Sequence, residues 1–184
     1  MWGGKTTFSW EQRKLGEIYD DVWSGNRLPK DYLVVGDTPF IVAQTKNNGV
    51  CAYVSNAQKD YNGKQMKLFP ANSVTFSIDN PEAIFVQYKP FFTSNIMRVL
   101  YNKELKTGSV VALSEMLKSL TQFYNWSFKF SGPVVMDSDI SVPIQPSGQI
   151  DYEELDKIGD YLKSISNLIT LHQREPLIIW RGLC

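Results

Sequence analysis

The stretch that decides the fold is TPFIVAQTKNNGVCAYV, residues Thr38 to Val54. Short β-branched and aromatic runs flank a polar tip from Gln44 to Gly49, a pattern that predicts a strand, a loop and a strand. Asn48 and Gly49 form the strongest local turn signal, since both residues tolerate positive φ. The tip also holds three other side chains of the kinds that hydrogen-bond base edges and phosphate oxygens: Thr45, Lys46 and Asn47. The stretch is therefore either a plain hairpin turn or a recognition loop.

The middle of the chain around this hairpin is rich in strand patterns. Alternation over 73–78 predicts a strand with Val74, Phe76 and Ile78 inward and Thr75 and Ser77 outward. Further strands are expected over 83–88, 95–100, 126–130 and 139–144. Strands that follow one another without intervening helices favour a mixed or antiparallel twisted sheet over a doubly wound one.

Helical spacing predicts three other elements. Residues 10–18 suggest a short helix that buries Trp10, Leu15 and Ile18, and apolar residues at three- and four-residue spacing mark an amphipathic helix over 110–124. A second long helix begins near Tyr152 and stops before Pro176, because proline lacks the backbone donor and clashes with the preceding turn. Its apolar stripe is narrow, like a coiled-coil seam that packs on a partner helix: Leu155, Ile158, Leu162, Ile165, Ile169 and His172.

These patterns place the chain in the α/β (α+β) class. We expect a mixed, largely antiparallel twisted sheet with packed helices, followed by a C-terminal helix of coiled-coil type. The predicted recognition domain covers residues 10–148 and the dimerisation helix covers 149–175, with tails at 1–9 and 176–184.

Composition narrows the class of protein further. With 184 residues, 43% of them hydrophobic, the chain can fill one well-packed core. No apolar run approaches the roughly 20 residues of a membrane span, no signal-peptide pattern opens the chain, and two cysteines do not make a disulfide framework. These features predict a cytoplasmic protein. The formal net charge is zero, but basic residues gather between Arg27 and Lys67 and acidic ones between Asp137 and Asp160, which suits an anionic ligand on one side.

The sequence contains no motif that supports catalysis or metal binding. A phosphate-binding loop, a dinucleotide fingerprint, a zinc-protease motif and a nucleophile elbow are all missing from it. The single histidine, His172, has no credible partner as a ligand or base, and Cys51 is predicted to be a small buried hydrophobe within a strand. We therefore expect no catalytic residue, no metal and no cofactor in this chain.

The sequence gives more support to a binding protein that contacts its ligand through polar loops. Polar tips recur near Arg27, Lys46, Lys64 and Asn95, and side chains of these types make contacts to base edges and phosphates. Any one such loop is ordinary solvated surface, whereas four on a compact β scaffold favour binding. The candidate DNA contacts are Arg27, Lys30, Thr45, Lys46, Asn47, Asn48, Lys64, Gln65 and Asn95.

Six segments, in order, resemble a known family. WEQRKLGEI at 10–18 and GNRLPK at 25–30 are similar to its opening segment and its G-x-R-L loop. The hairpin from Thr38 to Val50 resembles its I-P-(Y/F)-I…N-N-G-(I/V) signature, and FTSNIM at 92–97 resembles F-x-x-(D/S)-N-I-M. GQIDYE at 148–153 and ISNLITLHQR at 165–174 resemble its closing element and its L-D-N-L-I-T-L-H-Q-R helix. The chain is identified as similar to target recognition domains of type I restriction-modification specificity (S) subunits and of related type IIG and BcgI-like systems.

The resemblance implies a function as well as a fold. Such subunits read double-stranded DNA and hold methyltransferase and translocase-endonuclease subunits, and they are not themselves catalysts. In the family, S-adenosylmethionine, ATP and magnesium belong to those partner subunits. A full S subunit carries two recognition domains and two long helices, whereas this sequence has one of each, which suggests a half-subunit, truncated or paired with a copy of itself. The alternative is a fragment that regulates a restriction complex without reading DNA.

Overall fold

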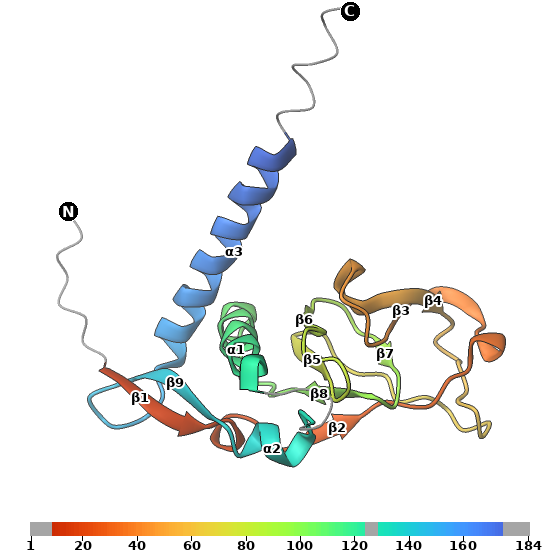
Figure 1. The fold of residues 1–184 in the computed structure, drawn as a ribbon, viewed down its shortest axis with the longest axis horizontal. Coiled ribbons are helices and arrows are strands. Elements are labelled where there is room, and N and C mark those ends of the chain that lie inside the picture. The colour runs from red at the N-terminus through yellow and green to blue at the C-terminus, as the bar shows by residue number, and fades with distance from the viewer. Residues whose placement is uncertain (1–8, 124–128, 175–184) are drawn as a thin grey trace, which may run out of the picture.

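The computed structural model describes residues 9–123 and 129–174 and contains three small β-sheets with helices packed against them (Figure 1). A two-stranded sheet pairs β1 (Ser9–Lys14) with β9 (Asp139–Ile144). A four-stranded sheet has the order β2 (Val22–Ser24), β8 (Met97–Leu100), β5 (Ser73–Ser77), β6 (Ile84–Gln87). A three-stranded sheet has the order β4 (Val50–Val54), β3 (Val35–Ile41), β7 (Phe92–Thr93).

The α-helices occupy the second half of the described chain: α1 (Thr107–Leu120), α2 (Gly132–Met136) and α3 (Tyr152–Arg174). Four single turns of 3-10 helix are spread along the described residues: η1 (Leu15–Glu17), η2 (Lys30–Tyr32), η3 (Asn47–Gly49) and η4 (Thr121–Phe123). The predicted fold class is confirmed, since every ladder is antiparallel except that between β3 and β7. The strand expected over 126–130 lies mostly outside the described residues, and α2 was not predicted.

The short helix expected over 10–18 is wrong. Residues Ser9–Lys14 form β1, which pairs along its whole length with β9, and only Leu15–Glu17 make a helical turn. Leu15 and Ile18 are buried as predicted, but the side chain of Trp10 is exposed. A partner strand about 130 residues away decides the conformation here, and no local pattern of helix spacing reports such a partner.

The alternation expected in β5 is also wrong in one respect. All five residues of β5 are buried, including Thr75 and Ser77, so both faces of this central strand are covered. The hydroxyl of Thr75 is satisfied within the protein: it donates to the carbonyl of Phe85 and accepts a hydrogen bond from Nε2 of Gln87. A buried threonine that both donates and accepts a hydrogen bond is compatible with a covered sheet face.

The main core lies where α1 packs against the four-stranded sheet and β9, and where α3 packs on α1 and β9. Two glycines let the helices approach closely: a Cβ built on Gly159 would lie 1.7 Å from the carbonyl oxygen of Gly108, and one on Gly108 would lie 2.2 Å from that of Asp156. The Asp156 carboxylate also accepts a hydrogen bond from the backbone N–H of Ser109, at the first turn of α1. The backbones of the two helices are therefore in direct contact where the helices cross.

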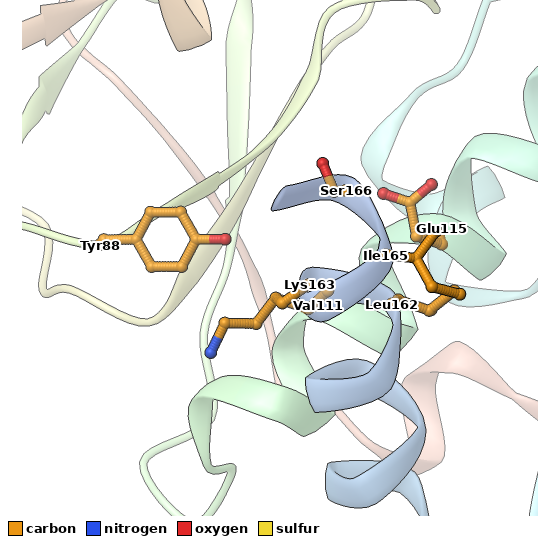
Figure 2. A pocket seen from close by; sticks show the side chains of 7 residues that line it. All are labelled: Tyr88, Val111, Glu115, Leu162, Lys163, Ile165 and Ser166. Carbon is orange, nitrogen blue, oxygen red and sulfur yellow. The ribbon is translucent and has the colours of Figure 1, made fainter. Parts of the chain in front are cut away.

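The first half of α3 is used within the chain. Leu155 is fully buried, and Ile158 and Leu162 pack against the same core. One turn further on, Ile165 and Ser166 line a shallow pocket with Tyr88, whose ring points toward the helix (Figure 2). Ile169 and His172 belong to the helix, but their side chains lie outside the described residues. The predicted partner-facing stripe is thus divided: its first three residues pack on the chain's own core.

Tyr19 offers a test of this core. Its ring is buried, and its hydroxyl has no hydrogen-bond partner among the described residues. A buried unpaired hydroxyl costs roughly 1–3 kcal/mol, so we expect Tyr19→Phe to leave the free energy of unfolding unchanged or to raise it by about 1 kcal/mol. Urea unfolding monitored by circular dichroism measures this change. A loss of about 2 kcal/mol or more would show that the hydroxyl has a stabilising partner.

Candidate nucleic-acid interface

The hairpin predicted from the sequence is present, with η3 at its tip. Asn47, Asn48 and Gly49 all have positive φ, at 52°, 51° and 77°. The side chains of Gln44 and Asn47 both donate to the carbonyl of Val50, which ties the tip to the start of β4. A Cβ on Gly49 would lie 2.9 Å from the Ile41 side chain, so this position requires glycine for both space and conformation.

Asn48 binds the tip to the neighbouring sheet. Its Nδ2 donates to the carbonyl of Val86 at 3.0 Å and to Oε1 of Gln87 at 3.2 Å, and Gln87 donates back to the Asn48 carbonyl. An amide nitrogen has two protons, and both are engaged here. Only Oδ1 of Asn48 is left for an outside ligand. Base contact by Asn48 stays a prediction, whereas its role in holding the loop is visible.

Asn48→Ala is expected to lower the free energy of unfolding by about 2 kcal/mol, because it removes two hydrogen bonds and leaves a β-carbon in the left-handed region. Asn48→Gly is the matched variant: it removes the same bonds but relieves the backbone, so its loss is expected to be about 1 kcal/mol smaller. Chemical denaturation of the two variants measures both effects. Equal stability of alanine variant and wild type would contradict the tethering role.

A second group of loops lies at the other end of the hairpin from η3. We call residues 25–33 and 55–67 the distal loop cluster; Figure 1 shows this part of the molecule at the right, away from α1 and α3. Hydrogen bonds hold its two segments together: the backbone N–H of Tyr61 donates to the carbonyl of Arg27, and Nε2 of Gln58 donates to the carbonyl of Tyr32. The cluster rests on β7 through Gly25, where a Cβ would lie 2.1 Å from the carbonyl oxygen of Thr93.

Asp60 organises the cluster from inside. It is buried; its Oδ1 accepts hydrogen bonds from the N–H groups of Asn62 and Lys64, and its Oδ2 accepts one from Nδ2 of Asn26. Burial by itself would raise the pKa of Asp60, but these hydrogen bonds, together with the charge of Lys64, outweigh it and hold the pKa below its ordinary value. The ionised form is therefore the one that stabilises the loop, and this contribution is lost as the pH falls through that lowered pKa.

Cationic side chains of the cluster make cation–π contacts with aromatic rings. The guanidinium of Arg27 lies 5.2 Å from the centre of the Tyr61 ring, and Tyr61 lies 5.8 Å from Tyr32. The ammonium of Lys67 lies 4.2 Å from the centre of the Trp23 ring. Tyr32 and Tyr61 are each about half exposed, at 51% and 50%. Exposed tyrosine and arginine side chains in contact are typical of binding surfaces.

The charge of this region is not compensated by ion pairs. Five basic residues belong to the cluster, and within the described residues none of them lies within 4 Å of a carboxylate oxygen: Arg27, Lys30, Lys59, Lys64 and Lys67. The ion pairs of the described chain involve other bases instead, such as Lys14, Lys118 and Lys157. Cations that have no acidic partner can neutralise phosphates without first breaking an ion pair.

The structure divides the predicted contact residues among three places. Arg27, Lys30, Lys64 and Gln65 belong to the distal loop cluster, where Gln65 also donates to the carbonyl of Asn56. Thr45, Lys46, Asn47 and Asn48 form the hairpin tip, and Asn95 is exposed in the turn after β7. Sequence reasoning missed the Asn26–Asp60 contact, Tyr32 and Lys67. The polar Asp60-Tyr61-Asn62-Gly63 turn was the only local signal for the buried carboxylate.

Other site types receive no support from the described residues. No group of histidine, cysteine or acidic side chains in residues 9–123 and 129–174 could hold a metal ion. Cys51 is exposed rather than buried as expected, and partial burial of its thiol nevertheless raises the pKa of the sulfur, which makes it a weaker nucleophile. No helix in these residues has the length and apolar character needed to cross a membrane.

Three solved structures share the fold. An S subunit of a type I restriction-modification system from M. genitalium matches 90% of this chain with a TM-score of 0.62 and 14% identity, and the HsdS subunit from Thermoanaerobacter tengcongensis matches 95% with 0.60 and 17%. A structure of type I restriction-modification complex assembly matches 94% with 0.63 and 17%. The matched regions make up 41%, 41% and 42% of those chains. The fold is thus that of restriction-modification specificity subunits.

Sequence comparison defines the family. The model of the type I restriction modification DNA specificity domain matches residues 9–177, and the chain belongs to this family. A curated relative, the specificity subunit S.BcgI of a type II restriction enzyme from Heyndrickxia coagulans, is 28% identical over 167 residues. That match covers 88% of this chain and 45% of the relative, so the chain spans less than half the length of the curated relative. The resemblance found in the sequence motifs is confirmed.

Proposed function

We propose that this chain is the sequence-reading part of a type I-like restriction-modification system, a single target recognition domain that binds double-stranded DNA. The observation that carries the proposal is the distal loop cluster, with its uncompensated bases and the exposed contact between Arg27 and Tyr61. Arginine can bind a guanine edge with two hydrogen bonds, and lysines such as Lys64 neutralise phosphates in any sequence. The hairpin tip and Asn95 add a second polar surface.

We propose further that the chain directs partner subunits and does no chemistry itself. Methyltransferase and endonuclease subunits would supply catalysis together with S-adenosylmethionine, ATP and magnesium. The partner helix contact would use the later turns of α3, from Ile165 onward, because Leu155 is already buried against the core. Tyr161, 65% exposed, lines a groove on α3 with Ile158 and Leu162, so the earlier turns also have apolar surface to offer. A homodimer paired through α3 would read a two-fold symmetric, bipartite site.

The proposal is tested by co-expression with a methyltransferase subunit in a host that lacks other specificity subunits, followed by methylation-sensitive sequencing. We expect a new modified motif, palindromic and interrupted by a spacer if two copies pair. Formation of the complex without any modified motif would contradict DNA reading. It would favour the alternative role, regulation of a restriction complex by an interacting fragment.

A further inference from the structure

Side chains join the two segments of the distal loop cluster at more than one place: Gln58 donates to the carbonyl of Tyr32, and a part-buried contact joins Asn26 to Asp60. Nδ2 of Asn26 donates to Oδ2 of Asp60 at 3.1 Å, across 34 positions of sequence. Asp60 is 8% exposed, and Asn26 is half-buried. The contact is therefore largely shielded from solvent.

Each member of this pair also holds its own surroundings. Oδ1 of Asn26 accepts a hydrogen bond from the backbone N–H of Lys67, and the backbone N–H of Asn26 donates to the carbonyl of Thr93. Oδ1 of Asp60 accepts from the N–H groups of Asn62 and Lys64. The pair thus joins β7, the segment that carries Arg27 and the turn that carries Lys64 into one hydrogen-bonded unit.

We infer that the Asn26–Asp60 pair is a positioning clamp that holds Arg27 and Lys64 in fixed relative places, so that base contact and phosphate contact are made by one preformed unit. The inference rests on the proposed DNA-reading function. Neither clamp residue contacts the ligand in this scheme: both act through the loops they hold. A preformed unit spends no free energy on ordering its loops at binding, and it keeps the base contact of Arg27 tied to the phosphate contact of Lys64.

The chemistry of the pair permits a swap test. Asn26→Asp places two carboxylates against each other, and Asp60→Asn leaves one amide N–H facing either Asn26 or the loop N–H groups. In the double variant N26D/D60N, the carboxylate introduced at position 26 accepts from the N–H of Lys67 and from the amide introduced at position 60. The oxygen of that amide still faces the N–H groups of Asn62 and Lys64. All four hydrogen bonds are then restored with one direction reversed.

Two matched charge controls accompany the swap. They are Asp31→Asn and Asn62→Asp, because both side chains are exposed and lie in the same cluster. Each control changes the charge of the cluster by the same amount as one of the single clamp variants, without touching the side-chain contact between Asn26 and Asp60. A difference between a clamp variant and its control therefore reports the contact and not the charge.

The first measurement uses amide hydrogen exchange on the intact chain without DNA. If the clamp joins the loops, Asn26→Asp speeds exchange of the Asn62 and Lys64 amides, and Asp60→Asn speeds exchange of the Asn26 amide, each by about tenfold or more. After correction for the intrinsic exchange rate of each substituted residue, the double variant returns all of them to the wild-type protection, and the two controls change none. Faster exchange confined to the segment that carries each substitution would overturn the inference.

The second measurement selects bound sequences from a pool of random duplex DNA with the intact chain. If wild type enriches a motif, we expect the preference of each single variant for that motif over other sequences to be at least about tenfold lower. We expect the double variant to regain the wild-type preference. Unchanged preference in the single variants would overturn the clamp while leaving the proposed function in place. Absence of any enriched motif with wild type would count against the proposed function, and hydrogen exchange alone would then decide the clamp.

Discussion

Replacing Gly159 with alanine is expected to lower the free energy of unfolding by about 3 kcal/mol, the upper end of the usual cost of overpacking. The added methyl would lie 1.7 Å from a backbone oxygen of α1, and backbone cannot rotate away as a flexible side chain can. Alanine in place of glycine normally stabilises a helix interior by about 1 kcal/mol. A loss at this position therefore reports the contact between α1 and α3 and not helix propensity.

Thermal and urea unfolding of the Gly159→Ala variant measure the effect, with an expected fall in Tm of roughly 10 °C for a chain of this size. Ser164→Ala is the control: it lies in the same helix, is exposed, and should change stability by less than about 0.5 kcal/mol. If Gly159→Ala stabilised the protein as propensity alone predicts, α3 would not pack on α1 in the way described.

The second large effect concerns the proposed DNA contacts. Arg27→Ala is expected to weaken binding to the preferred sequence by about 10- to 100-fold, because a bidentate base contact is worth roughly 1–3 kcal/mol of discrimination. Lys64→Ala is expected to weaken binding to all sequences alike and to reduce the slope of log K against log salt concentration by about one. Fluorescence anisotropy with labelled duplexes over a salt series separates the two results.

Lys103→Ala provides the matched control for this series. Lys103 is highly exposed and lies beside Glu104, outside the distal loop cluster, so its removal should leave affinity and salt slope unchanged. An equal loss for Lys103 and Lys64 would mean that binding depends on overall charge. Binding that did not respond to salt at all would contradict phosphate contact altogether.

Local patterns predicted the hairpin and the long helices well. Asn48 and Gly49 carry the positive φ values that their residue types favour, and the three- and four-residue spacing of Val110, Leu113 and Leu117 gives the buried face of α1. The family itself could be inferred from six short motifs. These features share one property: neighbours within a few positions determine them.

Features that depend on distant partners could not be predicted. Trp10 lies in a strand and not on the buried side of a helix because β9 pairs with this segment, and Thr75 is buried because both faces of β5 are covered. The same holds for the candidate site. Lys64 was chosen for its residue type, but the carboxylate that positions its loop, Asp60, is joined to Asn26 only in the folded chain.

The pairing of β1 with β9 has a consequence for how the chain folds during synthesis. β1 lies near the start of the described chain, but it cannot pair until β9 has been synthesised, since Ser9 pairs with Ile144. At usual rates of synthesis the strand stays unpaired for on the order of ten seconds. An apolar strand that stayed unpaired for that long would be prone to aggregation. β1 is instead polar and charged, with Glu11, Arg13 and Lys14 among its six residues, which keeps it soluble until its partner arrives.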